Sequence, residues 1–200
     1  GAGCGGDTTA PAVSAFALTN PSGQTLEVSF DTDERLGTAP TDLAISLDGP
    51  ETATLTRGDF TEQDNGDGTY TYTATYVAGS SGSYTATLTA ARDTAGNDGA
   101  GGEADSVVLP GTYSIASVSA TAAGGNDISV TADLRTTDSG AQVTVEALRN
   151  GDVRETTGPV AVEPAQPQTL VVGGANQADE IRVTLTDASG TVQATRTIPF

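Results

Sequence analysis

The side chains of this sequence that are best suited to chemistry are carboxylates gathered in the loops of its first half. The 200 residues include 26 acidic and eight basic residues, all eight of them arginine, so the formal net charge is −18. Carboxylate oxygens are hard ligands that suit Ca²⁺ better than zinc or copper. Two interpretations stay open: the loops hold a divalent cation, or they form an acidic surface that binds only water and loose salt cations. The second is the simpler, because loops are where acidic residues normally lie.

The residues that most catalytic sites need are missing. The chain has no histidine and one cysteine, which excludes a Ser-His-Asp triad, a His-ligated zinc and an internal disulfide. Adjacent acids such as Asp33–Glu34 and Asp179–Glu180 point to opposite faces of a strand, so they do not predict the facing carboxylates of a glycosidase. We therefore predict that the protein is not an enzyme.

Two further motifs have both a structural and a functional interpretation. The segment DNGDG at 64–68 is similar to the start of a calcium loop, but its third and twelfth positions are Gly66 and Thr75, so a hairpin turn is favoured. The tyrosines at 70, 72, 76 and 84 form a ladder that would suit a sugar or an aromatic ligand. Such residues are more often the bulkiest part of an alanine-rich core.

Composition also bears on habitat and partners. Abundant acid without lysine and a pI near 4.1 fit adaptation to a salt-rich medium, where salt screens the self-repulsion. The charge disfavours nucleic acid and anionic membrane surfaces, and no apolar run is long enough to span a membrane. Ala2-Gly3-Cys4 resembles the end of a lipoprotein signal, in which Cys4 would carry lipid; the alternative is an incidental cysteine in a linker.

The elements that must position these loops are strands. Apolar and polar residues alternate along the chain, clusters of Gly, Pro, Asn and Asp separate the alternating runs, and no helical period appears. This pattern predicts an all-β chain of two tandem Ig-like antiparallel β-sandwich domains. Residues 1–11 are expected to form a Gly-rich linker, 12–110 an acidic sandwich and 111–200 a second, Ig/fibronectin-like sandwich. The predicted strands are 12–18, 24–30, 42–48, 52–61, 69–77, 83–90 and 105–109, then 113–122, 126–135, 141–149, 153–163, 168–173, 179–187 and 191–199.

If successive strands of the first domain run up and down, its loops divide between the two ends of the sandwich. The N-terminal segment and the three long loops share the end at which the chain comes in, and the short turns share the other. The second end holds little acid beyond Asp48 and Glu51. The acids expected at the first end are Asp7, Asp31, Asp33, Glu34, Glu62, Asp64, Asp67, Asp93, Asp98 and Glu103.

The first half carries five segments that share the pattern of one family. They are DTTAP-x-V at 7–13, LEVSFDTDERL at 26–36, DNGDGTYTYTATY at 64–76, GSYTATLTAARDTAGNDGA at 82–100 and DSVVL at 105–109. Together they resemble the bacterial-type Ig-like modules repeated in surface glycoproteins and large adhesins of haloarchaea. The second half resembles Ig- or fibronectin-type surface modules in pattern only.

The resemblance implies a site and a role. In related adhesins, the aspartate before the first strand and an Asp…Gly-Asn loop hold calcium at a module junction, which here implies Asp7, Asp93 and Asn97, with Asp33 and Glu34 nearby. The family also implies an extracellular, non-enzymatic structural module of an S-layer, adhesin stalk or filament, which associates with copies of itself or with neighbouring Ig-like modules. The alternative is a binding module, such as an adhesin tip, receptor or virus-associated spike, that recognises a glycan or a surface protein.

Overall fold

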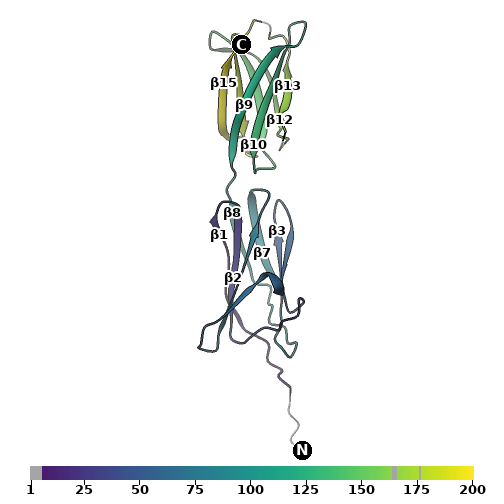
Figure 1. The fold of residues 1–200 in the computed structure, drawn as a ribbon, viewed down its shortest axis with the longest axis vertical. Helices are drawn as coiled ribbons and strands as arrows, with labels where there is room; N and C mark the ends of the chain where they lie inside the picture. Colours follow the sequence, from purple (N-terminus) through teal and green to yellow (C-terminus); the bar gives the residue numbers. More distant parts are fainter. Residues whose placement is uncertain (1–5, 164–165, 176) are drawn as a thin grey trace, which may run out of the picture. The chain divides into compact units, whose positions relative to one another are not determined.

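The structure, a computed structural model, describes residues 6–163, 166–175 and 177–200. The chain divides into two compact units, Gly1–Pro110 and Gly111–Phe200, here called unit 1 and unit 2. The described residues form 15 β-strands and one short 3-10 helix (Figure 1), and all strand pairings are antiparallel. The prediction of an all-β chain is therefore confirmed. Within these ranges no helix is both long and apolar enough to cross a membrane.

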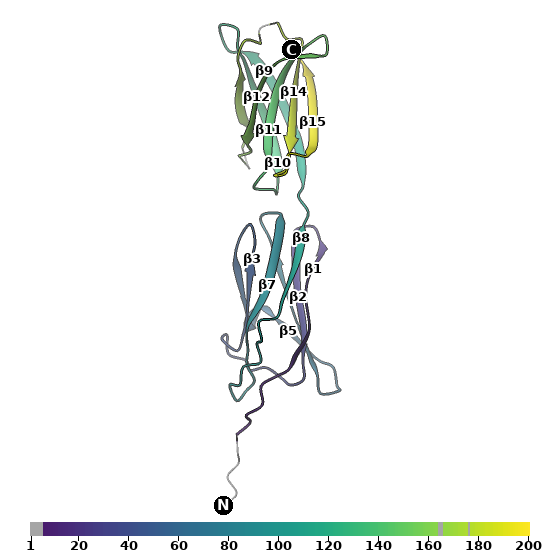
Figure 2. The same cartoon turned by 180° about the vertical axis from the view of Figure 1, so that it is seen from behind.

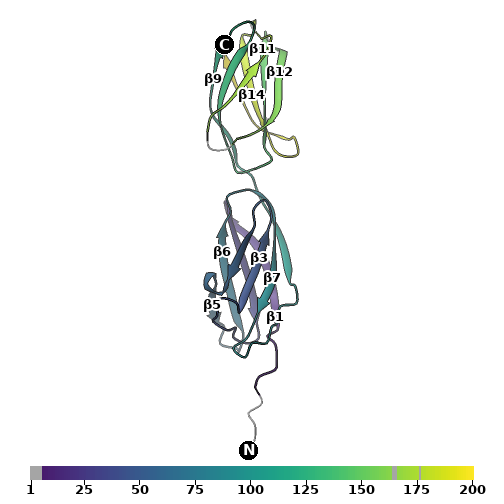
Figure 3. The same cartoon turned by 90° about the vertical axis from the view of Figure 1, so that its right-hand side faces the viewer.

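Unit 1 contains eight strands: β1 (Val13–Ser22), β2 (Thr25–Thr32), β3 (Leu43–Asp48), β4 (Ala53–Thr56), β5 (Thr61–Asp64), β6 (Tyr70–Val77), β7 (Gly82–Ala91) and β8 (Ala104–Leu109). They form two four-stranded sheets, with the orders β1-β2-β6-β5 and β4-β3-β7-β8. The first order is that of the ABED sheet of an Ig domain, and the second is a CFG sheet with one added edge strand. Figure 3 shows β3 and β7 side by side in the second sheet.

The alternation in the sequence produces one core between the two sheets of unit 1. Leu26 and Phe30 of β2 are fully buried with Tyr72 of β6, and Ile45 and Leu88 meet them from the other sheet. Phe30 stacks on Tyr72 with ring centroids 5.4 Å apart. Burying each such side chain stabilises the fold by about 1.5–3 kcal/mol, so the period-2 pattern fixes which face of each strand points inward.

One predicted element of unit 1 is wrong. The sequence predicts a single strand over 52–61, but the chain forms β4, a 3-10 turn η1 (Arg57–Asp59) and then β5, which belongs to the other sheet. The Thr56 N–H and Oγ1–H both donate to Asp59 Oδ2, at 2.7 and 3.2 Å, and these bonds close the turn. Alternation shows which side chains are buried and not which sheet a strand joins, so the crossing is invisible in the pattern.

Unit 2 contains seven strands: β9 (Tyr113–Ala122), β10 (Ile128–Thr136), β11 (Gln142–Arg149), β12 (Asp152–Ala161), β13 (Gln168–Val172), β14 (Glu180–Thr186) and β15 (Val192–Pro199). They form the sheets β13-β10-β9 and β12-β11-β14-β15, the second of which faces the viewer in Figure 2. Aliphatic side chains fill the core, among them Val130, Val145 and Val183, all fully buried. Each of the seven predicted strands is confirmed, with ends that differ by a residue or two.

In each unit the first and last strands lie side by side and run in the same direction (Figure 1). In unit 1, the Leu18 N–H of β1 donates to Asp105 Oδ2 of β8 at 2.9 Å. In unit 2, Arg196 Nη1 of β15 donates to the Ala116 carbonyl of β9 at 2.9 Å. The chain therefore comes into each unit at one end, its N-terminal pole, and leaves at the opposite end, its C-terminal pole.

Candidate functional site: the N-terminal pole of unit 1

Three carboxylates converge at the N-terminal pole of unit 1. Asp7 precedes β1, Glu34 follows β2 and Asp93 follows β7, and one oxygen from each lies within 4.8 Å of the other two. We call this group the carboxylate triad. The antiparallel order of the strands brings the three segments together, because β2 and β7 both end at this pole, close to where the chain comes in.

The Asp93 loop is shaped by the carboxylate itself. Asp93 is only 3% exposed, and its Oδ1 accepts the N–H groups of Ala95 and Asn97, each at 2.8 Å. The Asn97 side chain donates to Asp93 Oδ2 at 2.7 Å, and a bridge between Leu36 and Asp93 ties the loop to the segment after β2. The loop is therefore ordered from within, and Asp93 is held in a fixed place.

The incoming segment is pinned to the same pole. The Ala12 N–H donates to Asp33 Oδ1 at 2.7 Å, and Asn97 Nδ2 donates to the Asp7 carbonyl at 3.1 Å. Pro11 is buried, and a Cβ at Gly99 would lie 1.9 Å from its carbonyl oxygen, so only glycine allows this approach. The described part of the predicted linker is thus held to the body of unit 1 at Asp7 and at Pro11, while residues 6–10 stay exposed.

The triad is electrostatically strained. Partial burial raises the pKa of Glu34, and the negative charges of Asp7, Asp93 and Asp33 raise it further. Burial would also raise the pKa of Asp93, but hydrogen bonds from the Asn97 side chain and from backbone N–H groups lower it below its ordinary value. Asp93 is therefore a fixed anion, whereas the charged form of Glu34 is disfavoured by burial first and by the neighbouring carboxylates second.

The donor set fits a hard divalent cation. Ca²⁺ takes oxygen ligands at about 2.3–2.6 Å, so ligand atoms within 4.8 Å of one another are close enough to share one ion. Asp93 Oδ2 accepts one hydrogen bond, and a carboxylate oxygen has a second lone pair to offer. The triad holds no nitrogen or sulfur ligand, so it does not fit a metal that prefers imidazole or thiolate.

The structure sorts the five residues that the sequence pointed to into two groups. Asp7, Glu34 and Asp93 converge in the triad, whereas Asp33 and Asn97 bind the chain segments that carry it. Cys4, the predicted lipidation site, lies outside the described residues.

An ionic network next to the triad was not predicted from the sequence. Glu62, 15% exposed, binds Arg35 Nε at 2.7 Å and Arg57 Nη2 at 2.5 Å. It also accepts the Tyr72 hydroxyl at 3.2 Å, and that hydroxyl accepts the buried N–H of Leu36 at 2.9 Å. The network holds the loop after β2 in place. The only feature of the sequence that pointed to it was Arg57, an arginine within the run 52–61 that was expected to be a strand.

The tyrosine ladder is mostly core. Tyr72 and Tyr84 are fully buried, while Tyr70 and Tyr76 are partly exposed. The Tyr76 hydroxyl donates to Glu51 Oε1 at 2.8 Å. Two of the four side chains are therefore closed to a ligand, and the remaining pair forms a weak platform for a sugar or an aromatic group.

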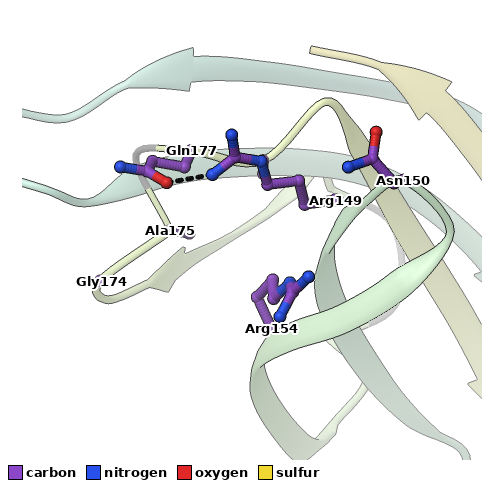
Figure 4. A pocket seen from close by; sticks show the side chains of 7 residues that line it. Arg149, Asn150, Arg154, Gly174, Ala175 and Gln177 are labelled. Carbon is purple, nitrogen blue, oxygen red and sulfur yellow. Dashed lines mark hydrogen bonds between the residues drawn. The ribbon is translucent and has the colours of Figure 1, made fainter.

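A pocket opens at the C-terminal pole of unit 2 (Figure 4). Its volume is about 410 Å³. Its polar lining comes from Arg149, Asn150 and Arg154 on one side and from Gln177 on the other. No acidic side chain is among the lining residues that the structure describes.

Fold and strand order define the chain as a tandem of Ig-like β-sandwich units. Among solved structures it is similar to dimeric latent PorU from Porphyromonas gingivalis, with 16% identity over 97% of this chain and 20% of PorU, at a TM-score of 0.38. It is also similar to a pair of tandem Ig domains of titin, with 14% identity over 96% of this chain and 94% of that one, at a TM-score of 0.38. The chain thus spans about a fifth of the PorU chain. No family model and no curated protein matches the sequence.

Proposed function

We propose that the chain is a structural module of an extracellular cell-surface assembly, such as an S-layer, an adhesin stalk or a filament, in a salt-rich medium. The excess of 26 acids over eight arginines supports the salt-rich setting, since dense salt screens the self-repulsion of such a surface. The sequence pattern that the first half shares with haloarchaeal surface modules supports the same setting. The partners would be further copies or neighbouring Ig-like modules.

The observation that carries this proposal is the course of the chain through each unit. The chain comes in at one pole and leaves at the other, and its first and last strands lie side by side in parallel. Tension applied to the chain ends must slide β1 along β8, and β9 along β15, before either unit can open. Such sliding strains the whole strand pair at once, which suits a module that carries load in series.

Pulling the full chain by its two ends in a single-molecule force experiment tests this role. Asp105→Ala removes the acceptor that holds the Leu18 N–H at 2.9 Å, so we expect unit 1 to unfold at a clearly lower force. Ser106→Ala, at the neighbouring position of β8, leaves that bond in place and is expected to change the force little. Equal unfolding forces for the two variants would contradict the load-bearing role of the β1–β8 contact.

We also propose that the carboxylate triad binds Ca²⁺ and so fastens the incoming segment to the pole. When bound, the ion would offset the neighbouring negative charges, which add to the effect of burial in raising the pKa of Glu34. Calcium titration at fixed ionic strength, followed by the melting temperature, tests the site. We expect a saturable rise that Asp7→Asn weakens and that Asp48→Asn, at the opposite pole, leaves unchanged. A rise equal in all three proteins, or none, would leave only general screening by salt.

A second candidate function is a binding module that recognises a glycan or a surface protein. The observation in its favour is the arginine-lined pocket of unit 2, because the polar groups of ligand sites are few and convergent. The partly exposed tyrosines support this candidate less, since two of the four tyrosines of the ladder are fully buried.

A further inference from the structure

The C-terminal pole of unit 2 places two arginines on one opening. Arg149 ends β11 and Arg154 lies in β12, and the hairpin between these strands forms one wall of the pocket. Gly174 and Gln177, from the connection between β13 and β14, form the other (Figure 4). We propose that this pocket binds a sugar that bears a carboxylate, a uronic acid. The inference rests on the binding-module candidate and is independent of the load-bearing role and of calcium.

The arginines of the pocket are weakly neutralised, one with no carboxylate within 4 Å and one in an exposed ion pair. Six of the eight arginines lie within 4 Å of a carboxylate. Arg149 does not, and among the described residues its partner is the amide oxygen of Gln177. Arg154 Nη2 lies 3.7 Å from Asp152 Oδ2, and both side chains are more than half exposed, so this pair contributes little and exchanges easily. In so acidic a chain, two weakly neutralised guanidiniums on one pocket predict an anionic ligand.

Two acids beside the pocket hold its walls, and a third, Glu155, lies against Gly174, with Oε1 3.5 Å from the place of a Cβ on that residue. Asp179 Oδ2 accepts the Asn150 N–H at 2.9 Å, which fixes the hairpin. Asp127 Oδ1 accepts the Gly174 N–H at 3.2 Å, which fixes the facing connection. Asp179 and Asp127 are therefore committed to backbone groups, and the charged and amide side chains among the described lining residues are guanidiniums, Asn150 and Gln177.

The chemistry of the lining selects a planar acid with hydroxyl groups beside it. A guanidinium presents paired N–H donors that match the two oxygens of a carboxylate. Arg149 uses one of its five N–H donors to bind Gln177. The Asn150 and Gln177 amides both donate and accept, as neighbouring hydroxyl groups require. A volume of about 410 Å³ falls within the range of small-molecule sites and admits a sugar ring. A bare inorganic anion would bind the arginines and would form no hydrogen bonds that need the Asn150 and Gln177 amides.

Titration of the full chain with sodium glucuronate, replacing sodium chloride at constant ionic strength, tests the proposal. Amide chemical shifts in NMR spectra are expected to move saturably around Arg149, Arg154 and Gln177. Arg149→Gln removes the donors to the carboxylate, so we expect about tenfold weaker binding, the scale of one hydrogen bond to a charged group. Arg154→Gln is expected to weaken binding severalfold. Both side chains are exposed, and dispersed spectra of the variants will show that they fold.

Two controls distinguish binding of the carboxylate in the pocket from a general effect of charge or of the sugar ring. Arg135→Gln removes an exposed arginine of β10 that pairs with Asp133, so it makes the same charge change away from the pocket and should leave the affinity unaltered. Glucose has the same ring without the carboxylate and should bind at least about tenfold more weakly. No saturable binding of glucuronate, equal binding of glucose, or an equal loss in Arg135→Gln would each overturn the proposal. Association between copies that Arg149→Gln abolishes, without sugar binding, would also overturn it and assign the pocket to a protein carboxylate.

Discussion

Removing one hydroxyl at Tyr72 tests how the N-terminal pole of unit 1 is held. The Tyr72 hydroxyl accepts the N–H of Leu36 at 2.9 Å and donates to Glu62 at 3.2 Å. Leu36 is fully buried, so Tyr72→Phe leaves its N–H without an acceptor and without access to water. An unsatisfied buried N–H costs about 1–3 kcal/mol, and a lost bond to a carboxylate adds to this, so we expect a loss of about 2–3 kcal/mol. That loss corresponds to a fall in melting temperature of roughly 10–15 °C.

Urea unfolding at constant salt, followed by tyrosine fluorescence, measures the loss, because four of the five tyrosines belong to unit 1. Hydrogen exchange of the Leu36 amide gives a local measure and should become faster in the variant. Tyr70→Phe is the matched control: Tyr70 is in the same strand, two residues away, and among the described residues its hydroxyl has no hydrogen bond. It should cost less than about 0.5 kcal/mol. Equal costs for the two variants, or unchanged exchange at Leu36, would refute the reasoning.

Three further predictions concern charge, alkaline pH and a turn. Glu34→Gln should stabilise the calcium-free chain at low salt by up to about 1 kcal/mol and abolish any calcium-dependent rise in melting temperature. The raised pKa of Glu34 means that the folded chain binds the proton of the Glu34 carboxyl more tightly than the unfolded chain does. The urea midpoint of the unmodified chain should therefore decline as pH rises through the titration of Glu34. The midpoint of the Glu34→Gln variant should decline less. Burial raises the pKa of Tyr72 to about 12 and also that of Tyr113. An unfolded tyrosine ionises near pH 10, so the contribution of each such tyrosine to the free energy of unfolding should be constant below about pH 10 and fall above it by about 1.4 kcal/mol per pH unit; no fall at alkaline pH would contradict this. Gly151→Ala forces a side chain onto a φ of 82° and should destabilise unit 2 by about 1 kcal/mol in urea unfolding, with Gly58→Ala in unit 1, where φ is not positive, as the comparison.

The sequence predicted the strands well because one physical signal dominates each of them. In β10, Ile128, Val130 and Leu134 alternate with polar residues, and they are the buried ones. The turn at Asn150–Gly151 was equally visible, since both residues have positive φ angles of 53° and 82°, which these residue types tolerate best. The one failure, at 52–61, came where the chain leaves one sheet for the other, because alternation carries no information about the choice of sheet.

The candidate sites were predictable in part. That acids gather at one pole follows from strand order alone, and the family pattern pointed to Asp7, Asp93 and Asn97, with Asp33 and Glu34 nearby. The sequence could not separate Asp7, Glu34 and Asp93 from Asp33 and Asn97, because the division depends on which side chains turn toward the chain and which toward one another. The arginine pocket was not predicted, because Arg149 and Gln177 meet across a sandwich and are 28 positions apart.

By itself, then, the sequence determined that the chain is all β, which side chains are buried and where its charge concentrates, since these depend on local alternation and on composition. Tertiary structure alone decided which carboxylates lie within reach of one ion, which arginines have no carboxylate within 4 Å, and which strands that are distant in the chain lie side by side. Those features arise from contacts between residues distant in the chain, and the short-range periodicity of a sequence does not record them.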